Sequence, residues 1–260
     1  MPCWGRYEQA RPGAPFTGNS RLVMNKKSAL PPGQKIYPSF DRFGLGKFAS
    51  RVPAEAARIS IDIAGDVASG MTVAAELARL PRVEQVTDFH CVTTWSFCSL
   101  RWEGVRFADF YREIVLPGAA PEGDASFVVL RGKDGYCVSM QLQDLLADDV
   151  LLADTLNGEK LGIDHGAPLR LVAPAHYGYK NAKHITAIEF WCDSRHYRFP
   201  LPYPNLMDHP RGRVALEERA RYIPNWIIRP LYRFLQPFAR RKHASYLRAH
   251  MKRHQDGHSA

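Results

Sequence analysis

Cys91 is the residue whose type and position in this sequence most directly suggest chemistry. It follows an apolar stretch and opens the segment CVTTWS. A cysteine in this place could be a small buried side chain, a nucleophile or a metal ligand. A nucleophile needs a nearby base, and His90 is adjacent, but neighbouring residues of a strand point to opposite faces. The sequence therefore argues against a thiol hydrolase, and metal ligation is the chemical alternative to a structural cysteine.

A second group of candidates lies in the segment DHGAPLRLVAPAHYGYKNAKHI, residues 164–185. Its basic side chains surround Gly166 and Gly178 and are His165, Arg170, Lys180 and Lys183. Arginine can bind phosphate bidentately, lysine adds point charges, and glycine permits close backbone approach. The segment predicts a cradle for an anion, and its alternative is a solvated basic loop. It contains no phosphate-binding loop of the Walker type, and no G-x-G-x-x-G follows a strand.

Short strands with a few short helices are predicted to position these residues. Alternating and β-branched patterns predict strands at 57–65, 82–92, 126–132, 136–141, 168–174 and 184–191, and Asn157-Gly158 predicts a turn within 150–161. Apolar residues at helical spacing predict helices at 72–81, 106–115 and 141–147. Residues 1–50, rich in Pro, Gly and Lys, predict an extended arm that wraps the body. Because strands and helices do not alternate regularly, we expect an α+β fold with a mixed sheet.

Composition excludes several protein classes. The chain has 260 residues, of which 45% are hydrophobic, without an apolar run long enough to span a membrane. The 5 cysteines are odd in number and include no C-x-x-C pair, which argues against a disulfide framework, a zinc ribbon and an iron–sulfur cluster. The first residues have no pattern typical of an export signal. A cytoplasmic location is therefore expected.

Positive charge gathers at the C-terminal end. The net charge is +9, and residues 209–260 hold 12 Lys/Arg and 3 Asp/Glu, so the remainder is electrically balanced. Aromatic and aliphatic residues occupy 226–238, between prolines at 224, 230 and 237, which predicts short kinked helical pieces. We expect residues 1–208 to form one domain and 209–260 to form a basic amphipathic helical tail. This tail could pack on its own body, a membrane surface or nucleic acid.

Four segments together resemble one enzyme family. "FHCVTTWS", "LRWEGV", "HGAPLRLVAP" and "YGYKNAKHI" are similar to the molybdopterin-binding domain of the sulfite oxidase family. The similarity is to its small, stand-alone bacterial members, which are related to the periplasmic methionine sulfoxide reductase catalytic subunit. It covers about residues 40–191, and the four motifs share the family's order and spacing. The resemblance implies a sulfite oxidase-type fold with mixed β-sheets and short helices.

The resemblance also implies a cofactor and its ligands. The cofactor would be molybdenum on a single molybdopterin, with Cys91 as the protein ligand to the metal. Trp95, Tyr177 and Tyr179 become candidates for substrate contact, although each could equally be a core aromatic. Contacts to the pterin and its phosphate would fall on Arg42, Phe43, His90, Gly132, His165, Arg170, Gly178, Tyr179, Lys180, Asn181, Ala182 and Lys183.

The expected activity is oxygen-atom transfer to or from a small sulfite-like or sulfoxide-like substrate. Electrons would be exchanged with a separate partner, which could be membrane-associated. Sulfite itself is not favoured, since sulfite oxidases carry an arginine in the loop after their cysteine, and here the loop is VTTW. The chain also has too few residues after Trp191 for the family's immunoglobulin-like dimerisation domain. The alternative is a non-enzymatic protein that binds nucleic acid or a membrane surface through its basic tail.

Overall fold

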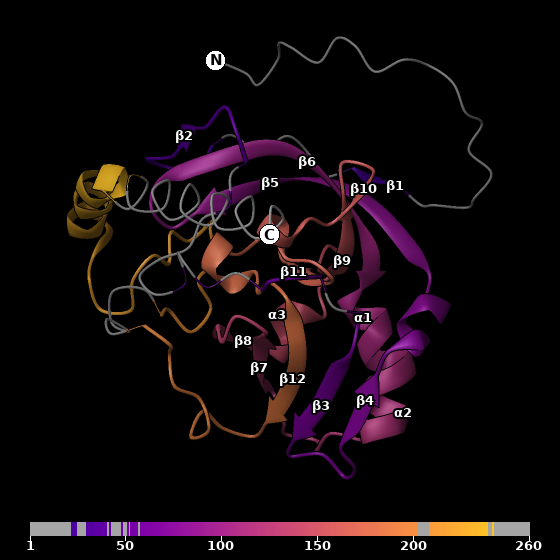
Figure 1. Cartoon of the computed structure of the whole chain (residues 1–260). Helices are drawn as coiled ribbons and strands as arrows, with labels where there is room; N and C mark the ends of the chain where they lie inside the picture. Colours follow the sequence, from indigo (N-terminus) through magenta and orange to yellow (C-terminus); the bar gives the residue numbers. More distant parts are fainter. Residues whose placement is uncertain are drawn as a thin grey trace, which may run out of the picture.

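Two mixed β-sheets and a few short helices form the body of the protein (Figure 1). The structure is a computed structural model that describes residues 22–24, 30–40, 42, 48, 51, 53–56, 58–201, 208–238 and 241. Each sheet contains both parallel and antiparallel strand pairs. The predicted α+β class is confirmed. In the described ranges, no helix has the length and apolar character needed to cross a bilayer.

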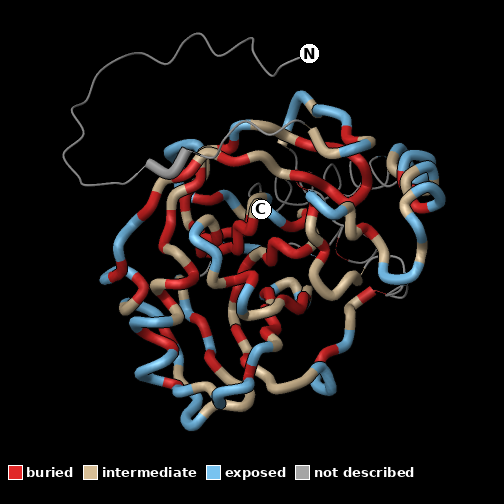
Figure 2. Tube along the Cα trace, turned by 180° about the vertical axis from the view of Figure 1, so that it is seen from behind, coloured by how far each residue is buried: buried red, intermediate tan, exposed pale blue. Residues whose placement is uncertain are grey.

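The first sheet is built on a long hairpin. Strands β5 (Arg82–Cys91) and β6 (Trp95–Arg106) pair antiparallel, with Cys91 opposite Trp95. Buried and more exposed residues alternate along much of β5, as Figure 2 shows for the strands generally. The other strands of this sheet are β1 (Leu22–Met24), β2 (Lys35–Ile36), β9 (Leu151–Leu156), β10 (Glu159–Lys160) and β11 (Arg170–Val172).

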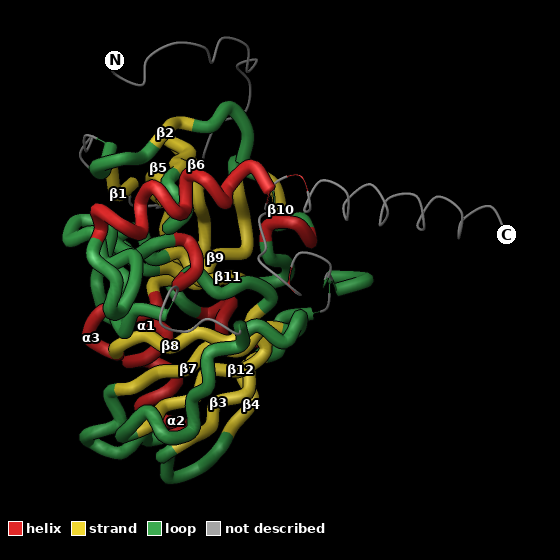
Figure 3. The backbone as a smooth tube through the Cα atoms, turned by 90° about the vertical axis from the view of Figure 1, so that its left-hand side faces the viewer, coloured by secondary structure: helices red, strands yellow, loops and turns green. Residues whose placement is uncertain are grey.

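The second sheet lies below the first in the views of Figures 1 and 3. Its order is β4-β3-β12-β7-β8, so that β12 lies between a parallel and an antiparallel neighbour. The five strands are β3 (Ile61–Gly65), β4 (Met71–Val73), β7 (Phe127–Gly132), β8 (Cys137–Gln141) and β12 (Ile185–Trp191). The predicted β7–β8 hairpin around the Lys-Asp-Gly turn is confirmed.

The helical segments between the strands are short, whereas a longer helix covers residues 225–238. The predicted helix over 106–115 is present as α1 (Phe107–Phe110), a π-helical turn (Tyr111–Val115) and α2 (Leu116–Ala119). The third helix is α3 (Leu142–Leu145). Three 3₁₀ helices cover Ala75–Arg79, Ile163–His165 and Gly178–Lys180.

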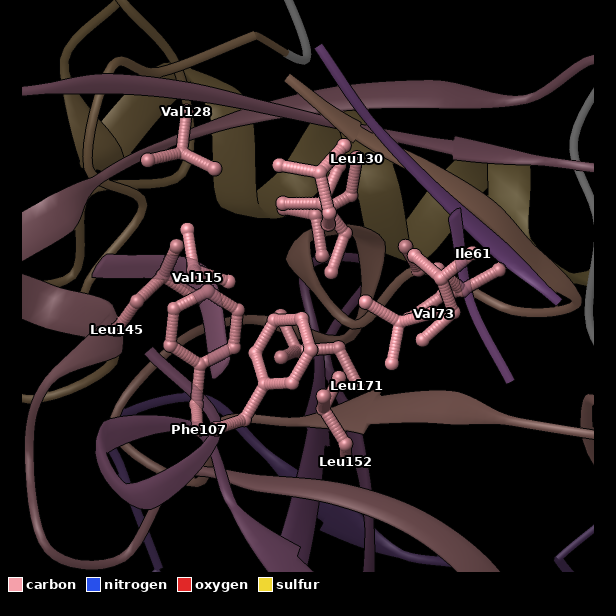
Figure 4. Packing of buried hydrophobic residues seen from close by; sticks show 14 of the residues in the cluster. Ile61, Val73, Phe107, Val115, Val128, Leu130, Leu145, Leu152 and Leu171 are labelled. Carbon is pink, nitrogen blue, oxygen red and sulfur yellow. The ribbon is translucent and has the colours of Figure 1, made fainter. Parts of the chain in front are cut away.

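The main hydrophobic core lies between the two sheets. Figure 4 shows that the sheets and the helical segments all supply side chains to it. Ile61 and Leu130 come from the second sheet, Leu152 and Leu171 from the first, and Phe107 from α1. All five are at most 1% exposed. This shared core fixes the two sheets relative to each other, and with them the residues at their edges.

Two local predictions were wrong. The helix expected over 72–81 begins as strand β4, because Thr72 and Val73 pair with β3, and only Ala75–Arg79 is helical. In the tail, residues 225–238 form one continuous helix where short pieces were expected. Pro230 removes a hydrogen bond there, but burial of Ile228 and Tyr232 against the body favours the uninterrupted helix.

Residues 208–238 lie against the body. Arg211 forms an ion pair with Asp144 of α3, and Arg219 is fully buried. The helix at 225–238, yellow at the left of Figure 1, lies outside the first sheet near β2. Its Gln236 donates a hydrogen bond to the hydroxyl of Tyr37, in the arm, at 2.8 Å. The division into 1–208 and 209–260 stays a prediction.

Gly65 provides a test of how β3 and β12 pack. Its φ is +106°, and a Cβ atom at this position would lie 2.1 Å from the carbonyl oxygen of Phe190. We expect Gly65→Ala to lower the free energy of unfolding by roughly 2–4 kcal/mol in urea denaturation. Gly123→Ala is the matched control, because a Cβ there meets nothing within 4 Å. A loss no larger than in this control would contradict the packing described here.

Candidate active site

A pocket opens beside the end of β5 and reaches between the two sheets. It is open to solvent on one side, and its lining combines aromatic and charged side chains. Its walls come from the arm, the β5–β6 turn, the β7–β8 turn and the segment 178–183. The lining residues are Phe40, Arg42, Phe48, Phe89, Cys91, Val92, Trp95, Asp134, Tyr136, Arg170, Gly178, Tyr179, Asn181, Lys183, Phe199 and Leu201.

The turn that follows Cys91 is tightly held. Thr94 has φ +72°, and its N–H donates to the carbonyl of Cys91 at 3.2 Å, which closes the turn. From the arm, Gln34 donates its side-chain amide to the same carbonyl at 3.0 Å. From the tail, Arg219 donates to the carbonyl of Val92 at 2.8 Å. Segments from both sides of the sequence therefore fix the position of Cys91.

The sulfur of Cys91 is suited to hold a metal. The residue is 5% exposed and lines the pocket, and its Sγ lies 3.1 Å from the hydroxyl of Thr93. His90, the neighbouring residue, does not line the pocket, and its Nδ1 lies 2.8 Å from the hydroxyl of Ser96. Burial lowers the pKa of His90, so the ring is neutral. The opposite orientation of these two neighbours agrees with the strand argument made from the sequence.

Two cations line the same pocket, the buried Arg170 and the partly buried Lys183. Arg170 is 1% exposed, donates to the carbonyls of Leu171 and His165, and lies over the ring of Trp102. Lys183 donates to the carbonyl of Asp164 at 2.9 Å. Burial lowers the pKa of Arg170 to about 9. Burial, together with Arg170, lowers the pKa of Lys183 well below its usual value.

No carboxylate in the described part of the chain lies within ion-pair distance of Arg170 or Lys183. Arg42 adds a third positive charge to the lining and donates to the carbonyls of Phe48 and Arg51. Asp134 also lines the pocket, and Asp134 and Asp164 act on Arg42 and Lys183 only from a greater distance, so the three cations outnumber the carboxylates near them. The pocket is therefore prepared for an anion.

Two of the predicted glycines allow close approach. A Cβ at Gly132 would lie 2.4 Å from the carbonyl oxygen of Lys183, so only glycine lets these backbones come this near. A Cβ at Gly178 would lie 2.1 Å from the ring of Phe89. Gly178 lines the pocket and Gly132 does not. Gly132 thus supports the position of Lys183 from outside the pocket.

The structure brings together eight of the predicted site residues. They line the pocket and are Arg42, Cys91, Trp95, Arg170, Gly178, Tyr179, Asn181 and Lys183. Asn181 accepts from the N–H of Ala173 and donates to the carbonyl of Tyr177, which holds the segment between them in place. Six others do not line the pocket, namely His90, Gly132, His165, Tyr177, Lys180 and Ala182. Phe43 lies outside the described residues.

The residues outside the lining have identifiable surroundings. Lys180 is fully buried and donates to the carbonyls of Ser139 and Pro210, and burial lowers its pKa to about 8. His165 stacks on Phe40 with ring centroids 5.2 Å apart. Ala182 belongs to the main core. These positions support the pocket walls from behind.

Tyr177 is buried behind the Cys91 turn. It packs with Val92 of the turn and with Ile228 and Tyr232 of the tail helix. Its hydroxyl has no hydrogen-bond partner among the described residues, and the guanidinium of Arg219 lies 4.9 Å from the centre of its ring. Burial raises the pKa of Tyr177 to about 12. Its role as a substrate contact stays a prediction.

Sequence reasoning missed several wall residues. Phe89 lies two residues before Cys91 on the same strand, so the period of two along a strand could have identified it. Asp134 lies in the β7–β8 turn that the sequence did predict. Phe199 and Leu201 follow β12 and carry no local signal. Only the folded chain brings these two to the pocket.

Arg219 offers a test of how the Cys91 turn is held. We expect Arg219→Met to leave the carbonyls of Val92 and Pro32 without their buried donor and to destabilise the protein by about 2–4 kcal/mol. Amide hydrogen exchange in residues 91–95 should accelerate more than in the second sheet. Arg195→Met, at an arginine side chain that is 84% exposed, should change neither measurement. Uniform acceleration throughout the protein would show that Arg219 has no particular role at the turn.

Comparisons with known proteins agree with this geometry. The family model described as the oxidoreductase molybdopterin binding domain matches residues 49–198. The uncharacterised oxidoreductase YuiH of Bacillus subtilis (strain 168) is 33% identical over 178 residues, which cover 67% of this chain and 85% of that protein. The putative protein-methionine-sulfoxide reductase subunit YedZ1 of Azospira oryzae is 37% identical over 113 residues, covering 44% of this chain and 41% of that protein.

A solved structure is similar over part of its length. The sulfane dehydrogenase SoxCD from Paracoccus pantotrophus has a TM-score of 0.45 and 22% identity, covering 52% of this chain and 38% of that chain. The family match extends over more than half of the 260 residues, and the similarity to YuiH extends over two thirds of them. This chain therefore belongs to the family of oxidoreductases with a molybdopterin-binding domain, the family that its cysteine and anion-site motifs predicted.

Proposed function

We propose that this protein transfers an oxygen atom to or from a small sulfite-like or sulfoxide-like substrate at molybdenum carried by a single molybdopterin. The observation that carries the proposal is one pocket lined by a buried thiol, Cys91, and by two cations, the buried Arg170 and the partly buried Lys183. A thiolate suits a soft metal, and cations suit a phosphate. These are the two ends of a metal-bearing, phosphorylated pterin.

The residues present fit this cofactor. Arg170 and Lys183 would bind the phosphate, which would place a negative charge next to two cations that have no carboxylate within ion-pair distance among the described residues. Asn181 and Tyr179 would line the pterin. Cys91 would ligate molybdenum, and the hydroxyl of Thr93 would hydrogen-bond its sulfur. When bound, the cofactor supplies two-electron redox chemistry and an exchangeable oxygen, while the protein supplies position and electrostatics.

The aromatic walls would exclude water from the reacting centre. The ring centroids of Phe40 and Phe89 are 5.1 Å apart in an edge-on arrangement, and those of Phe89 and Trp95 are 5.7 Å apart. The side of the pocket near Cys91 is therefore apolar. An apolar wall favours a neutral sulfoxide over a sulfite anion. The naming of YedZ1 as a putative protein-methionine-sulfoxide reductase subunit supports the same substrate class. Methionine sulfoxide reduction and sulfite oxidation, each assayed with an artificial dye, would distinguish the two substrates.

Electrons would be exchanged with a separate partner, which we also propose. The word "subunit" in the name of YedZ1 supports a partner of this kind. We retain the cytoplasmic location as part of the proposal. The four described cysteines form no disulfide, which is compatible with that location, and cell fractionation tests it. Nucleic-acid binding through the tail is not favoured, because the tail's aromatic residues alternate with Ile and Leu as in an apolar docking face.

Cys91→Ser provides the first test of the metal ligand. We expect this variant to lose activity by at least about a hundredfold, because a hydroxyl ligates a soft metal poorly, while the metal carried by the pterin is retained. The fold should survive, as measured by the thermal midpoint. Metal content is measured on protein purified from molybdenum-replete cells. Cys98→Ser is the control, and if its loss matched that of Cys91→Ser, the assignment of the ligand would be wrong.

The phosphate cradle is tested by Arg170→Ala and Lys183→Ala. A charge-assisted hydrogen bond contributes about 1.5–3 kcal/mol, so each change should weaken cofactor retention roughly ten- to a hundredfold. Retention is measured by the pterin content of purified protein. Lys160→Ala is the matched control, because this lysine side chain is 78% exposed. Full pterin content in the double variant would overturn the assignment.

The lowered pKa of Lys183 predicts a pH dependence. Anion binding requires the protonated ammonium, so the affinity of cofactor-free protein for inorganic phosphate should fall as pH rises through this lowered pKa. The free energy of unfolding should rise over the same interval, because the unfolded state then binds more protons. Calorimetry and urea denaturation from about pH 7 to 10 measure the two trends. Lys183→Met should remove the pH dependence of both the phosphate affinity and the free energy of unfolding. If these trends persist in the variant, another titrating group causes them.

A further inference from the structure

The helix at residues 225–238 has two apolar faces. Its inner face carries Ile228 and Tyr232, which are 0% and 5% exposed and pack against Val92 and Tyr177. A helix that ordinarily packs on a body has a polar outer face. Here the outer side is apolar as well, and its large side chains are exposed: Trp226 (76%), Ile227 (41%), Phe234 (68%), Leu235 (45%) and Phe238 (55%).

The outer residues form an ordered row. Positions 226, 230, 234 and 238 are spaced by four, so they follow one another along one side of the helix. The row consists of Trp226, Pro230, Phe234 and Phe238, and the last two rings are 5.5 Å apart. Figures 2 and 3 show this helix at the periphery, raised above the strands that it crosses. A contiguous exposed aromatic row of this kind marks an interaction surface.

Charge identifies the kind of surface that would cover the row. Arg233 lies on the same helix and donates a hydrogen bond to the carbonyl of Gly33. Arg221 lies just before the helix, with its guanidinium over the ring of Tyr222. In the sequence, residues 239–255 add six Lys/Arg and no Asp/Glu. Aromatic rings combined with basic residues are typical of segments that bind at the membrane interface. A convex helix also meets a bilayer along its whole length, whereas a protein partner would need a matching groove.

We propose that the outer face of helix 225–238 binds the surface of anionic phospholipid bilayers. Trp226, Phe234 and Phe238 would enter the headgroup region, and the basic residues would contact lipid phosphates. The inner face of the same helix contacts Val92, which follows Cys91, so the candidate metal site would lie about one helix diameter, ~10 Å, from the docked face. This inference concerns lipid binding and does not depend on the proposed reaction.

Vesicle flotation of the full-length protein tests the proposal. Vesicles of phosphatidylcholine are compared with vesicles that also contain phosphatidylglycerol. We expect binding at least about tenfold stronger to the anionic vesicles, weakening as salt screens the charges. The triple variant Trp226→Ser, Phe234→Ser, Phe238→Ser should lose binding about tenfold or more, since aromatic burial contributes to interfacial binding. Leu116→Ser, at an exposed leucine of α2, is the matched control and should bind like the parent protein.

Trp226 fluorescence gives a second measurement. The difference in emission between the parent protein and Trp226→Phe should shift to shorter wavelength when anionic vesicles are added, because the indole leaves water. The thermal midpoint of each variant shows whether it is folded. Absence of binding by the folded parent protein would overturn the proposal, as would unchanged binding by the triple variant. A dimer that the triple variant dissociates would assign the face to a second copy of the chain instead.

Discussion

The positive charges of Arg170, which is buried, and of Lys183, which is partly buried, are the constraint on which the candidate site depends. Neither has a carboxylate within ion-pair distance among the described residues, and burial lowers the pKa of both. Uncompensated charge of this kind destabilises a fold unless a bound anion offsets it. Strand β11 presents Arg170, the residues leading into β12 present Lys183, and Gly132 lets the two backbones of the second sheet approach. The anion site therefore lowers the free energy of unfolding of the cofactor-free protein, and we expect the bound cofactor to raise it again.

At the other end of the pocket, the requirement is a fixed thiol rather than a charge. Cys91 is the last residue of β5. Its carbonyl accepts a hydrogen bond from Gln34, 57 residues earlier in the arm, and the carbonyl of Val92 accepts one from Arg219, 127 residues later in the tail. Both lie outside the segment 49–198 that matches the family. The flanking segments are thus part of the site's architecture, and the geometry of the thiol depends on contacts that form only when the whole chain folds. A metal ligand benefits from this arrangement because outer contacts orient it.

Local patterns in the sequence predicted several strands, because alternation along β3 and β5 reflects burial on one face. They did not predict the long strand β6, whose segment was interpreted as a loop. The motif that begins at Cys91 and the positions of Arg170 and Lys183 could also be found, since their residue types carry chemistry. Other features depend on tertiary contacts that no local pattern contains. Thr72 and Val73 became a strand because β3 is available as a partner, and the tail helix runs through Pro230 because its inner face is buried. Arg219 reads in the sequence as one more basic tail residue, yet it is fully buried against the Cys91 turn.

The tail helix connects these observations. Its inner face completes the packing behind the Cys91 turn, so its position and the geometry of the thiol are coupled through Val92 and Tyr177. Its outer face is apolar and is flanked by positive charge. A force on the outer face of the helix would also move Val92 and Tyr177, because buried side chains in contact do not move independently. If the helix docks on a bilayer as proposed, the bilayer and the Cys91 turn lie on opposite faces of one helix. The distance between the docking surface and the redox centre is then fixed by the thickness of a single helix.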